Sequence, residues 1–337
     1  MGQSDLYALA DLVLELHSDG PRREGLDRLL QELSWVRTSR STYKPDLYLS
    51  VSSNNREFRV PQNSREVFRT DDFLGYEVDD DFYLTDRFSV YQLRPTKGEG
   101  YARLAPSFFA KPPLAQGNFW CFGLLKLLRP MGIYSLHAAG LASRDGGGLL
   151  LVGASGSGKS TLAIGLIRQG WRYLSDDAVL LRYGSQGGVE ALACRRSFYI
   201  DAARSHDYSD LSLGEEKPDS NGGQRRTIGI DEAYPDQYVP RCLPRVVIFP
   251  QIKRQDQSTL KPSASVRALG FLLAQSAPQL FDRRTMASHL EILKGLLQQT
   301  ETYELNAGRD LYREPAKLID LIKEAQGREN CRGLSLS

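Results

Sequence analysis

A glycine-rich segment from Gly153 to Thr161 has the residue types and spacing of a phosphate-binding loop. Its first eight residues read Gly-Ala-Ser-Gly-Ser-Gly-Lys-Ser and fit the pattern G-x-x-x-x-G-K-[ST] in full. Glycines let the backbone approach an anion closely, and successive backbone N–H groups at a helix N-terminus then converge on it. The predicted nucleotide contacts are Gly153, Ala154, Ser155, Gly156, Ser157, Gly158, Lys159, Ser160 and Thr161.

Two side chains of this segment have separate tasks. Lys159 supplies a full positive charge for the β- and γ-phosphates, and the Ser160 hydroxyl is a ligand for Mg²⁺. The flanking residues predict a short apolar strand from Leu149 to Val152 and a helix that begins at Lys159 and is closed by Gly170. A glycine-rich turn with an incidental lysine would not need this strand–loop–helix context. We therefore expect a site for ATP and Mg²⁺.

An acidic pair follows the next predicted strand. Asp176 and Asp177 lie just beyond residues 171–174, where both side chains can turn toward a bound triphosphate. One carboxylate could then hold Mg²⁺ while the other accepts a proton. On its own an Asp-Asp pair is more often a solvated turn, because aspartate favours turns. Because the phosphate-binding loop is close by, we favour a functional role for this pair over a solvated turn.

His137 precedes the loop by one predicted strand, which covers residues 136–142. A single histidine in apolar surroundings is usually a core residue whose polar atoms are satisfied. Here its strand is expected to neighbour the loop strand, which would bring the imidazole near the γ-phosphate.

Three arginines are candidates for phosphate or substrate contacts. Arg225 and Arg226 follow the polar, glycine-rich residues 205–224, which predict a mobile loop, and Arg309 lies near the C-terminus. Phosphoryl transfer needs cations on the equatorial oxygens of the transferred group. The alternatives are a solvated arginine pair for the first two and a salt bridge with Asp310 or a helix end for Arg309.

Composition narrows the class of protein. The formal net charge is +2, so nucleic acid and anionic membranes are not expected partners. The sequence contains no run of 18 apolar residues and no pattern of a secretory signal, which predicts a cytoplasmic protein without membrane spans. The four cysteines are not at metal-ligand spacing and are expected to be free thiols.

Two domains are predicted. Residues 1–115 form an N-terminal α+β module, with helices over Leu6 to Leu16 and Leu26 to Val36 before a small, mainly antiparallel sheet. Residues 116–330 form the catalytic domain, which opens with a dense apolar helix over 116–130 and ends with helices near 283–299 and 314–326. Peptide recognition by strand addition is the hypothesis for the N-terminal module.

Residues Leu136 to Leu181 resemble the catalytic core of the HPr kinase/phosphorylase family. The resemblance rests on the histidine strand, the loop from Gly153 to Ser160, and the hydrophobic strand that ends in Asp176-Asp177. It implies an α/β fold, in which a P-loop core has a mixed sheet similar to that of the HPr kinase C-terminal domain and phosphoenolpyruvate carboxykinase. It also implies Mg²⁺-dependent serine phosphorylation, with Lys159 on phosphate and Ser160 and Asp177 on the metal. Asp176 would be the base for the serine proton, and His137 would lie by the γ-phosphate.

The chain departs from this family in two places. The acidic Glu-Arg-Gly-like segment is not recognisable in residues 190–196, and the downstream signature of phosphorylase activity is absent. The region before residue 130 also differs from the family's N-terminal domain. The whole chain is more similar to the HPr kinase-like proteins of ribosomal peptide biosynthesis, including kinases of lasso-peptide precursors, which phosphorylate a serine of the precursor.

The leading hypothesis is a Mg-ATP-dependent kinase for a serine hydroxyl on a peptide or small protein. One alternative is a kinase for a hydroxyl-bearing metabolite, and another is a nucleotide-binding regulator without phosphoryl transfer. Similarity to the hexameric HPr kinases also raises a homo-oligomer as a hypothesis.

Overall fold

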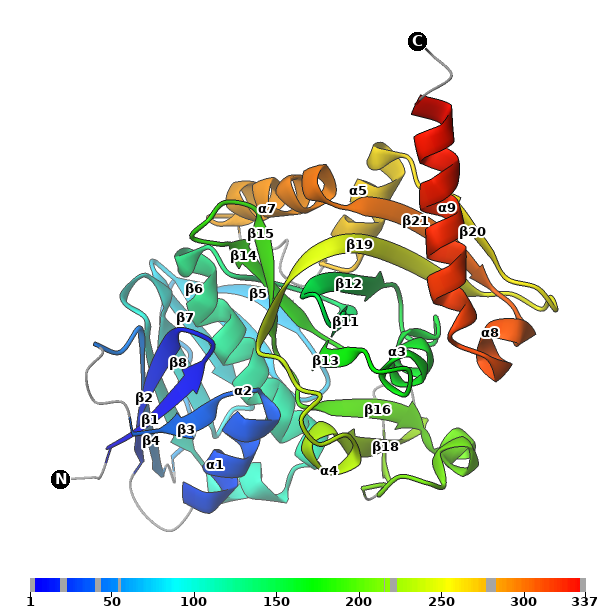
Figure 1. The fold of residues 1–337 in the computed structure, drawn as a ribbon. Helices are drawn as coiled ribbons and strands as arrows, with labels where there is room; N and C mark the ends of the chain where they lie inside the picture. The colour runs from blue at the N-terminus through cyan, green and yellow to red at the C-terminus, as the bar shows by residue number, and fades with distance from the viewer. Residues whose placement is uncertain are drawn as a thin grey trace. The chain divides into compact units, whose positions relative to one another are not determined.

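The computed structural model describes residues 4–18, 23–39, 44–53, 56–214, 216–218, 223–276 and 283–333. Two compact units are present, Met1–Tyr134 and Ser135–Ser337 (Figure 1). They divide after Tyr134, later in the chain than the boundary predicted after residue 115. Helix α2 (Pro113–Leu128), which was predicted to open the catalytic domain, therefore lies in the first unit.

The first unit contains a nine-stranded sheet in the order β3-β1-β2-β4-β9-β8-β7-β6-β5. β2 and β4 pair in parallel, as do β4 and β9. The other six strand pairs are antiparallel, so the sheet is mainly antiparallel, as predicted, although its nine strands make it larger than the small sheet expected. The strands are β1 (Ser4–Leu9), β2 (Leu12–Ser18), β3 (Val36–Thr38), β4 (Leu47–Ser53), β5 (Arg65–Arg69), β6 (Leu74–Val78), β7 (Asp81–Thr85), β8 (Val90–Arg94) and β9 (Glu99–Leu104).

The helix predicted over the first leucine run is wrong, because β1 and β2 form an antiparallel hairpin there. Buried and less buried side chains alternate along β1, so the hydrophobic period is two, and Ala10 adopts a positive φ of 53° at the turn. Sheet pairing overrides the helical propensity of leucine. The second predicted helix is confirmed in part as α1 (Arg23–Glu32), which buries Leu26 and Leu30. Its predicted end was wrong, because Val36 begins β3.

Helix α2 supplies aromatic side chains to the core of the first unit. Phe119 and Trp120 are buried and pack against the ring of Tyr91 from β8. Gly123 makes room for that ring, because a Cβ there would lie 1.9 Å from Tyr91 Cε1. This helix is therefore held by side-chain packing within its own unit.

The second unit is built on a mixed sheet in the order β10-β14-β15-β19-β12-β11-β13. β21 pairs in parallel with β19, which is also parallel to β12, and β20 pairs with β21. A separate three-stranded sheet has the order β16-β18-β17. The strands are β10 (Tyr134–Leu136), β11 (Ala138–Ala142), β12 (Gly147–Val152), β13 (Arg172–Ser175), β14 (Val179–Tyr183), β15 (Val189–Ala193), β16 (Ser197–Asp201), β17 (Lys217–Pro218), β18 (Gln224–Gly229), β19 (Arg241–Ile252), β20 (Thr259–Pro262) and β21 (Glu301–Ala307).

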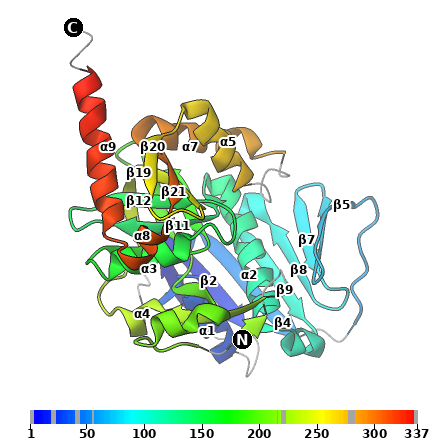
Figure 2. The same cartoon turned by 90° about the vertical axis from the view of Figure 1, so that its right-hand side faces the viewer.

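Helices cover both faces of this sheet. Figures 1 and 2 show α3 on one face and α5 and α7 on the other. The helices predicted near 283–299 and 314–326 are confirmed as α7 and α9. The helices of the unit are α3 (Lys159–Ile167), α4 (Ile230–Ala233), α5 (Ser265–Ala274), α7 (Met286–Gln299), α8 (Arg309–Arg313) and α9 (Lys317–Gly333), with a 3₁₀ helix η4 (Ala202–Tyr208). Within the described ranges, none of the helices combines the length and apolar character that crossing a bilayer requires.

Candidate functional site

Strand register brings the predicted site residues to one edge of the second unit's sheet. β11 is antiparallel to β12, with Ala138 opposite Val152, so His137 lies beside the loop that follows β12. β11 is also antiparallel to β13, with Gly140 opposite Ser175, which places Asp176 at the same edge. Three segments separated in the sequence thus meet because β11 lies between β12 and β13.

The loop after β12 depends on glycine at several positions. Gly156 and Gly158 have φ values of 79° and 96°, a region that favours glycine. A Cβ on Gly153 would lie 2.8 Å from Ser157 Oγ, so this position has no room for a side chain without rearrangement. Helix α3 begins immediately after Gly158. The strand–loop–helix arrangement expected from the sequence is present.

The buried Lys159 ammonium lies inside its own loop. Nζ donates to the carbonyl oxygens of Gly153 at 2.7 Å and Ala154 at 3.0 Å, and it lies 3.1 Å from His137 Nε2. Burial lowers the pKa of Lys159, while the carboxylates of Asp176 and Asp177 act in the opposite direction. The amine is therefore held by acceptors of the protein at the site where phosphate oxygens are predicted to bind.

His137 connects Lys159 with the acidic pair. Its Nδ1 lies 2.7 Å from the carbonyl oxygen of Asp177 and 3.4 Å from Oδ1 of the same residue. Because a carbonyl only accepts, Nδ1 carries the proton in this arrangement, which leaves Nε2 to accept from Lys159. Burial and the charge of Lys159 lower the pKa of His137, against the opposing effect of Asp177. The imidazole thus bridges the two groups in its neutral form.

Asp176 is a buried carboxylate with one unused oxygen. Its side chain is 1% exposed, and Oδ2 accepts from Ser160 Oγ at 2.8 Å and from the backbone N–H of Tyr199 at 3.3 Å. Oδ1 is buried and has no hydrogen-bond partner within the described part of the chain. Burial, with a smaller effect of Asp177, raises the pKa of Asp176 to about 6. Such a group can accept a proton near neutral pH.

Asp177 has a different environment from its neighbour. Its φ is 66°, which is uncommon for a residue other than glycine, and its side chain is 37% exposed. The turn between β13 and β14 thereby directs one carboxylate inward and leaves the other accessible.

These groups line a cavity with a volume of about 450 Å³. Its wall includes His137, Ser155, Gly156, Gly158, Lys159, Ser160, Thr161, Asp176, Asp177 and Arg225. Gly153, Ala154 and Ser157 are not part of that wall: the first two direct their carbonyls at Lys159, and Ser157 Oγ is buried.

Strand alternation separates the two adjacent arginines of β18. Arg225 lies opposite Asp201 of β16, and its Nη2 donates to Ser155 Oγ in the loop at 2.8 Å. Arg226 lies on the other face of the strand and forms a 3.3 Å ion pair with Glu216. Arg225 therefore reaches the cavity and Arg226 does not line it.

Arg309 lies away from the cavity. Its guanidinium is 73% exposed and lies 3.6 Å from Asp256, whereas Asp310 accepts from the backbone and hydroxyl of Ser258. Arg309 therefore forms a salt bridge, as the alternative predicted, but its partner is Asp256 and not Asp310.

Comparison with known proteins finds a relative for part of the chain. A curated protein named HPr kinase/phosphorylase, from Chlorobium chlorochromatii (strain CaD3), is 41% identical over 69 residues. The match spans 20% of this chain and 20% of that relative. Over these residues the chain is similar to HPr kinase/phosphorylase. The family resemblance predicted from the sequence is thereby confirmed.

A search of solved structures matches the Hpr(Ser) kinase/phosphatase from Coxiella burnetii. The similarity covers 60% of this chain and 95% of that chain, with 13% sequence identity and a TM-score of 0.31. No family model matches the chain.

The cavity has further lining residues that were not predicted from the sequence. Tyr199 and Asp201 come from β16, Arg204 and Tyr208 from η4, and Ile252 from the end of β19. None belongs to a motif, and they join the site only through tertiary contacts. The polar residues 205–224, predicted as a mobile loop, include the end of η4 and β17; residues 215 and 219–222 lie outside the described part.

Proposed function

We propose that the chain is a Mg-ATP-dependent kinase that transfers the γ-phosphoryl group to a serine hydroxyl of a peptide or small protein. The observation that carries this proposal is Asp176, a buried carboxylate with one unpaired oxygen, held against Ser160 at the start of α3. A nucleotide-binding protein without phosphoryl transfer has no need of a proton acceptor at this point.

The residues around the cavity fit both ATP and Mg²⁺. Positive-φ glycines and the N-terminus of α3 suit phosphate oxygens, with Lys159 as the cation for the β- and γ-phosphates. Ser160 and Asp177 offer oxygen ligands, which Mg²⁺ prefers, together with phosphates and water. When bound, Mg²⁺ would neutralise charge on the phosphates.

The proposed reaction balances with the groups at hand. The acceptor oxygen forms a bond to the γ-phosphorus, the bond from that phosphorus to the β–γ bridging oxygen breaks, and ADP leaves. The hydroxyl proton passes to Asp176, whose raised pKa matches that task at neutral pH. Arg225, held at the loop by Ser155, supplies a cation for the transferred group. His137 keeps Lys159 in place through Nε2.

Several finer assignments are part of the same proposal. The core is a P-loop fold related to the HPr kinase C-terminal domain and phosphoenolpyruvate carboxykinase, and residues 1–115 serve in recognition of the acceptor. The acceptor includes serines of ribosomal peptide precursors, and homo-oligomers form. A cytoplasmic location is also part of the proposal. Cys121, Cys194 and Cys242 are buried. The side chain of Cys331 lies outside the described part.

A metabolite kinase is the second candidate, because the site is a cavity of about 450 Å³, a size that suits small ligands. The same residues would act, and only the acceptor would differ.

The decisive experiment is transfer from γ-labelled ATP with Mg²⁺ to a panel of serine peptides, with Asp176→Asn beside the wild type. We expect label on peptide serine in the wild type and a loss of at least about a hundredfold in the variant, as for other proton-transfer residues. Asp210→Asn is the control, since Asp210 is exposed and pairs with Arg168 outside the cavity. ATP binding without label on any peptide would contradict the peptide kinase and favour the metabolite kinase or the regulator.

A further inference from the structure

Ile252 is an apolar side chain exposed at the wall of an otherwise polar cavity. It is the last residue of β19, it is 58% exposed, and it lines the cavity. Its Cγ1 lies 3.4 Å from where a Cβ on Gly158 would be, so the side chain lies over the end of the loop. Nothing in the proposed phosphoryl transfer uses an apolar group at this place.

Arg204 is a cavity arginine whose guanidinium is fixed by two other side chains. Its Nε donates to Asp207 Oδ2 at 3.2 Å, and its Cζ lies 4.5 Å from the ring centroid of Tyr312. The hydroxyl of Tyr312 donates to the same carboxylate oxygen. A planar group held in this way loses little conformational freedom when it contacts a ligand.

The positions of Ile252 and Arg204 are linked through β21. Ile252 pairs with Ala307 at the end of β21, and α8, which follows directly, carries Tyr312 beneath Arg204. The backbone N–H of Arg309 at the start of α8 also donates to the carbonyl of Gln255, just beyond Ile252. Both cavity residues therefore belong to the side of the cavity that β19, β21 and α8 support.

The direction of a triphosphate in such a loop indicates what this side receives. Lys159 serves the β- and γ-phosphates, while the backbone of the loop cradles the α- and β-phosphates. The reactive γ end lies with His137, Asp176 and Asp177, which come from the β11–β13 edge of the sheet. The nucleoside must then leave toward another part of the cavity wall.

We propose that Ile252 and Arg204 form a subsite for the planar base of the nucleotide. Ile252 offers an apolar surface for one face of the base, and the guanidinium of Arg204 is a planar cation of the kind that stacks on aromatic rings. Tyr312 and Asp207 act as positioning residues for Arg204. This inference rests on the proposed nucleotide binding and adds the site that distinguishes a nucleotide from a bare polyphosphate.

The test compares Mg-ATP with magnesium tripolyphosphate, which has the phosphates but no nucleoside. Binding of both ligands is measured by calorimetry for the wild type, Arg204→Ala and Ile252→Ala. We expect each variant to weaken ATP binding about tenfold and to change tripolyphosphate binding less than about twofold. Ile252 is a surface residue, so its variant tests the subsite even if Arg204→Ala fails to fold.

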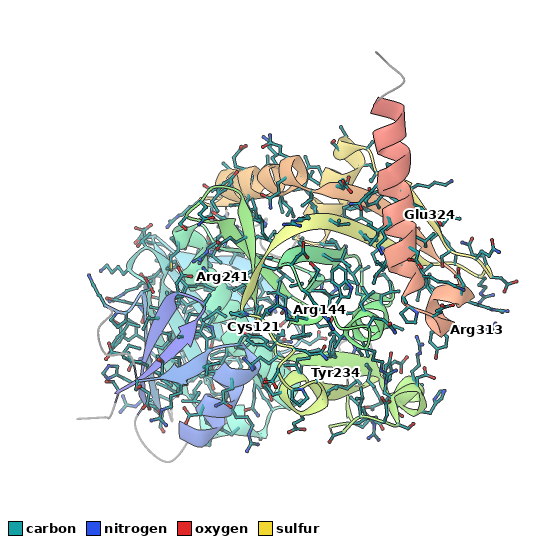
Figure 3. All side chains as sticks on the ribbon, viewed as in Figure 1. Cys121, Arg144, Tyr234, Arg241, Arg313 and Glu324 are labelled. Carbon is teal, nitrogen blue, oxygen red and sulfur yellow. The ribbon has the colours of Figure 1, made fainter. Side chains whose placement is uncertain are left out.

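Arg168→Ala is the matched control. Arg168 also has a carboxylate partner, Asp210, and a nearby tyrosine ring, Tyr208, and its exposure of 37% is close to the 34% of Arg204. It also donates to Tyr234, labelled in Figure 3, and it does not line the cavity. Arg168 itself does not line the cavity, although the Tyr208 ring beside it does, and we expect the affinity for either ligand to change less than about twofold.

Three results would overturn the inference. Equal weakening of ATP and tripolyphosphate would assign Arg204 to the phosphates, and unchanged ATP binding in both variants would remove the subsite. Failure of the folded wild type to bind either ligand would overturn the proposed nucleotide function itself, an outcome distinct from the loss of the base subsite alone.

Discussion

At the level of the single residue, the pKa of Asp176 is raised by some of its neighbours and lowered by others. Burial and the neighbouring Asp177 favour the protonated form, whereas the hydrogen bonds from Ser160 and the backbone of Tyr199 favour the carboxylate. Burial prevails, so the pKa is raised from 3.8 to about 6. A carboxyl group buried in this way reduces the stability of the folded protein whenever it is ionised.

This coupling predicts a pH-dependent stability difference between the wild type and Asp176→Asn. The unfolded chain releases its proton first, so the folded state binds more protons between about pH 4 and pH 6, and stability falls as pH rises through that window. A pKa difference of about two units corresponds to a penalty of up to about 3 kcal/mol above pH 6. In denaturant unfolding without nucleotide, the free energy of unfolding of Asp176→Asn should increase relative to that of the wild type from pH 4 to pH 7.

Asp210→Asn provides the reference, because its carboxylate is exposed and pairs with Arg168 outside the cavity. A free energy of unfolding for Asp176→Asn that follows the wild type in parallel across this range would show that the carboxylate is not destabilised by burial.

Secondary-structure periodicity decides side-chain roles at the level of the element. In β18 the alternation of a strand sends Arg225 to the cavity and Arg226 to Glu216. In α2 the position along the helix likewise decides what a side chain would contact. A Cβ at Gly123 would meet the ring of Tyr91, whereas a Cβ at Gly117 would meet nothing within 4 Å.

The strand alternation predicts opposite outcomes for two adjacent substitutions. Arg225→Ala should lower the rate of phosphoryl transfer by at least about a hundredfold, because the transferred group loses a cation. Arg226→Ala should change the rate less than about threefold, since Arg226 does not line the cavity. Single-turnover rates at saturating Mg-ATP distinguish them, and similar rates for both variants would contradict the assignment of Arg225.

The α2 glycines provide a corresponding test of packing. Gly123→Ala should destabilise the first unit by about 1–3 kcal/mol, because the core around Tyr91 must shift to accept a methyl group. Gly117→Ala should instead raise stability by up to about 1 kcal/mol, since alanine is the better helix former and the space is open. Chemical denaturation of the two variants gives both values, and destabilisation by both would indicate that helix geometry rather than Tyr91 is responsible.

The whole molecule contains two compact units with separate sheets, and every residue that lines the described cavity belongs to the second. The residues predicted to bind phosphate therefore lie in one unit, around β11, β12 and β13. The first unit has its own core around α2 and Tyr91. Its proposed role in acceptor recognition is a separate question from the chemistry of the cavity.

Local sequence was sufficient to predict the loop, the strand before it and α3. Their conformation depends on residues within a short stretch, namely the glycines that permit positive φ and an apolar strand on one side. The family resemblance followed from the same stretch, together with His137 and the Asp176-Asp177 pair. The helices near the C-terminus were also predictable, because their apolar residues recur with helical spacing.

Tertiary structure alone decided the features that depend on pairing and register. The leucines from Leu6 to Leu16 suit either a helix or a hairpin, and sheet partners selected the hairpin. The register of β16 against β18 selected Arg225 over Arg226. Arg204 and Ile252 reached the cavity through η4 and the end of β19, segments distant in the sequence from the loop. Such contacts depend on long-range packing, which no local pattern in one sequence records.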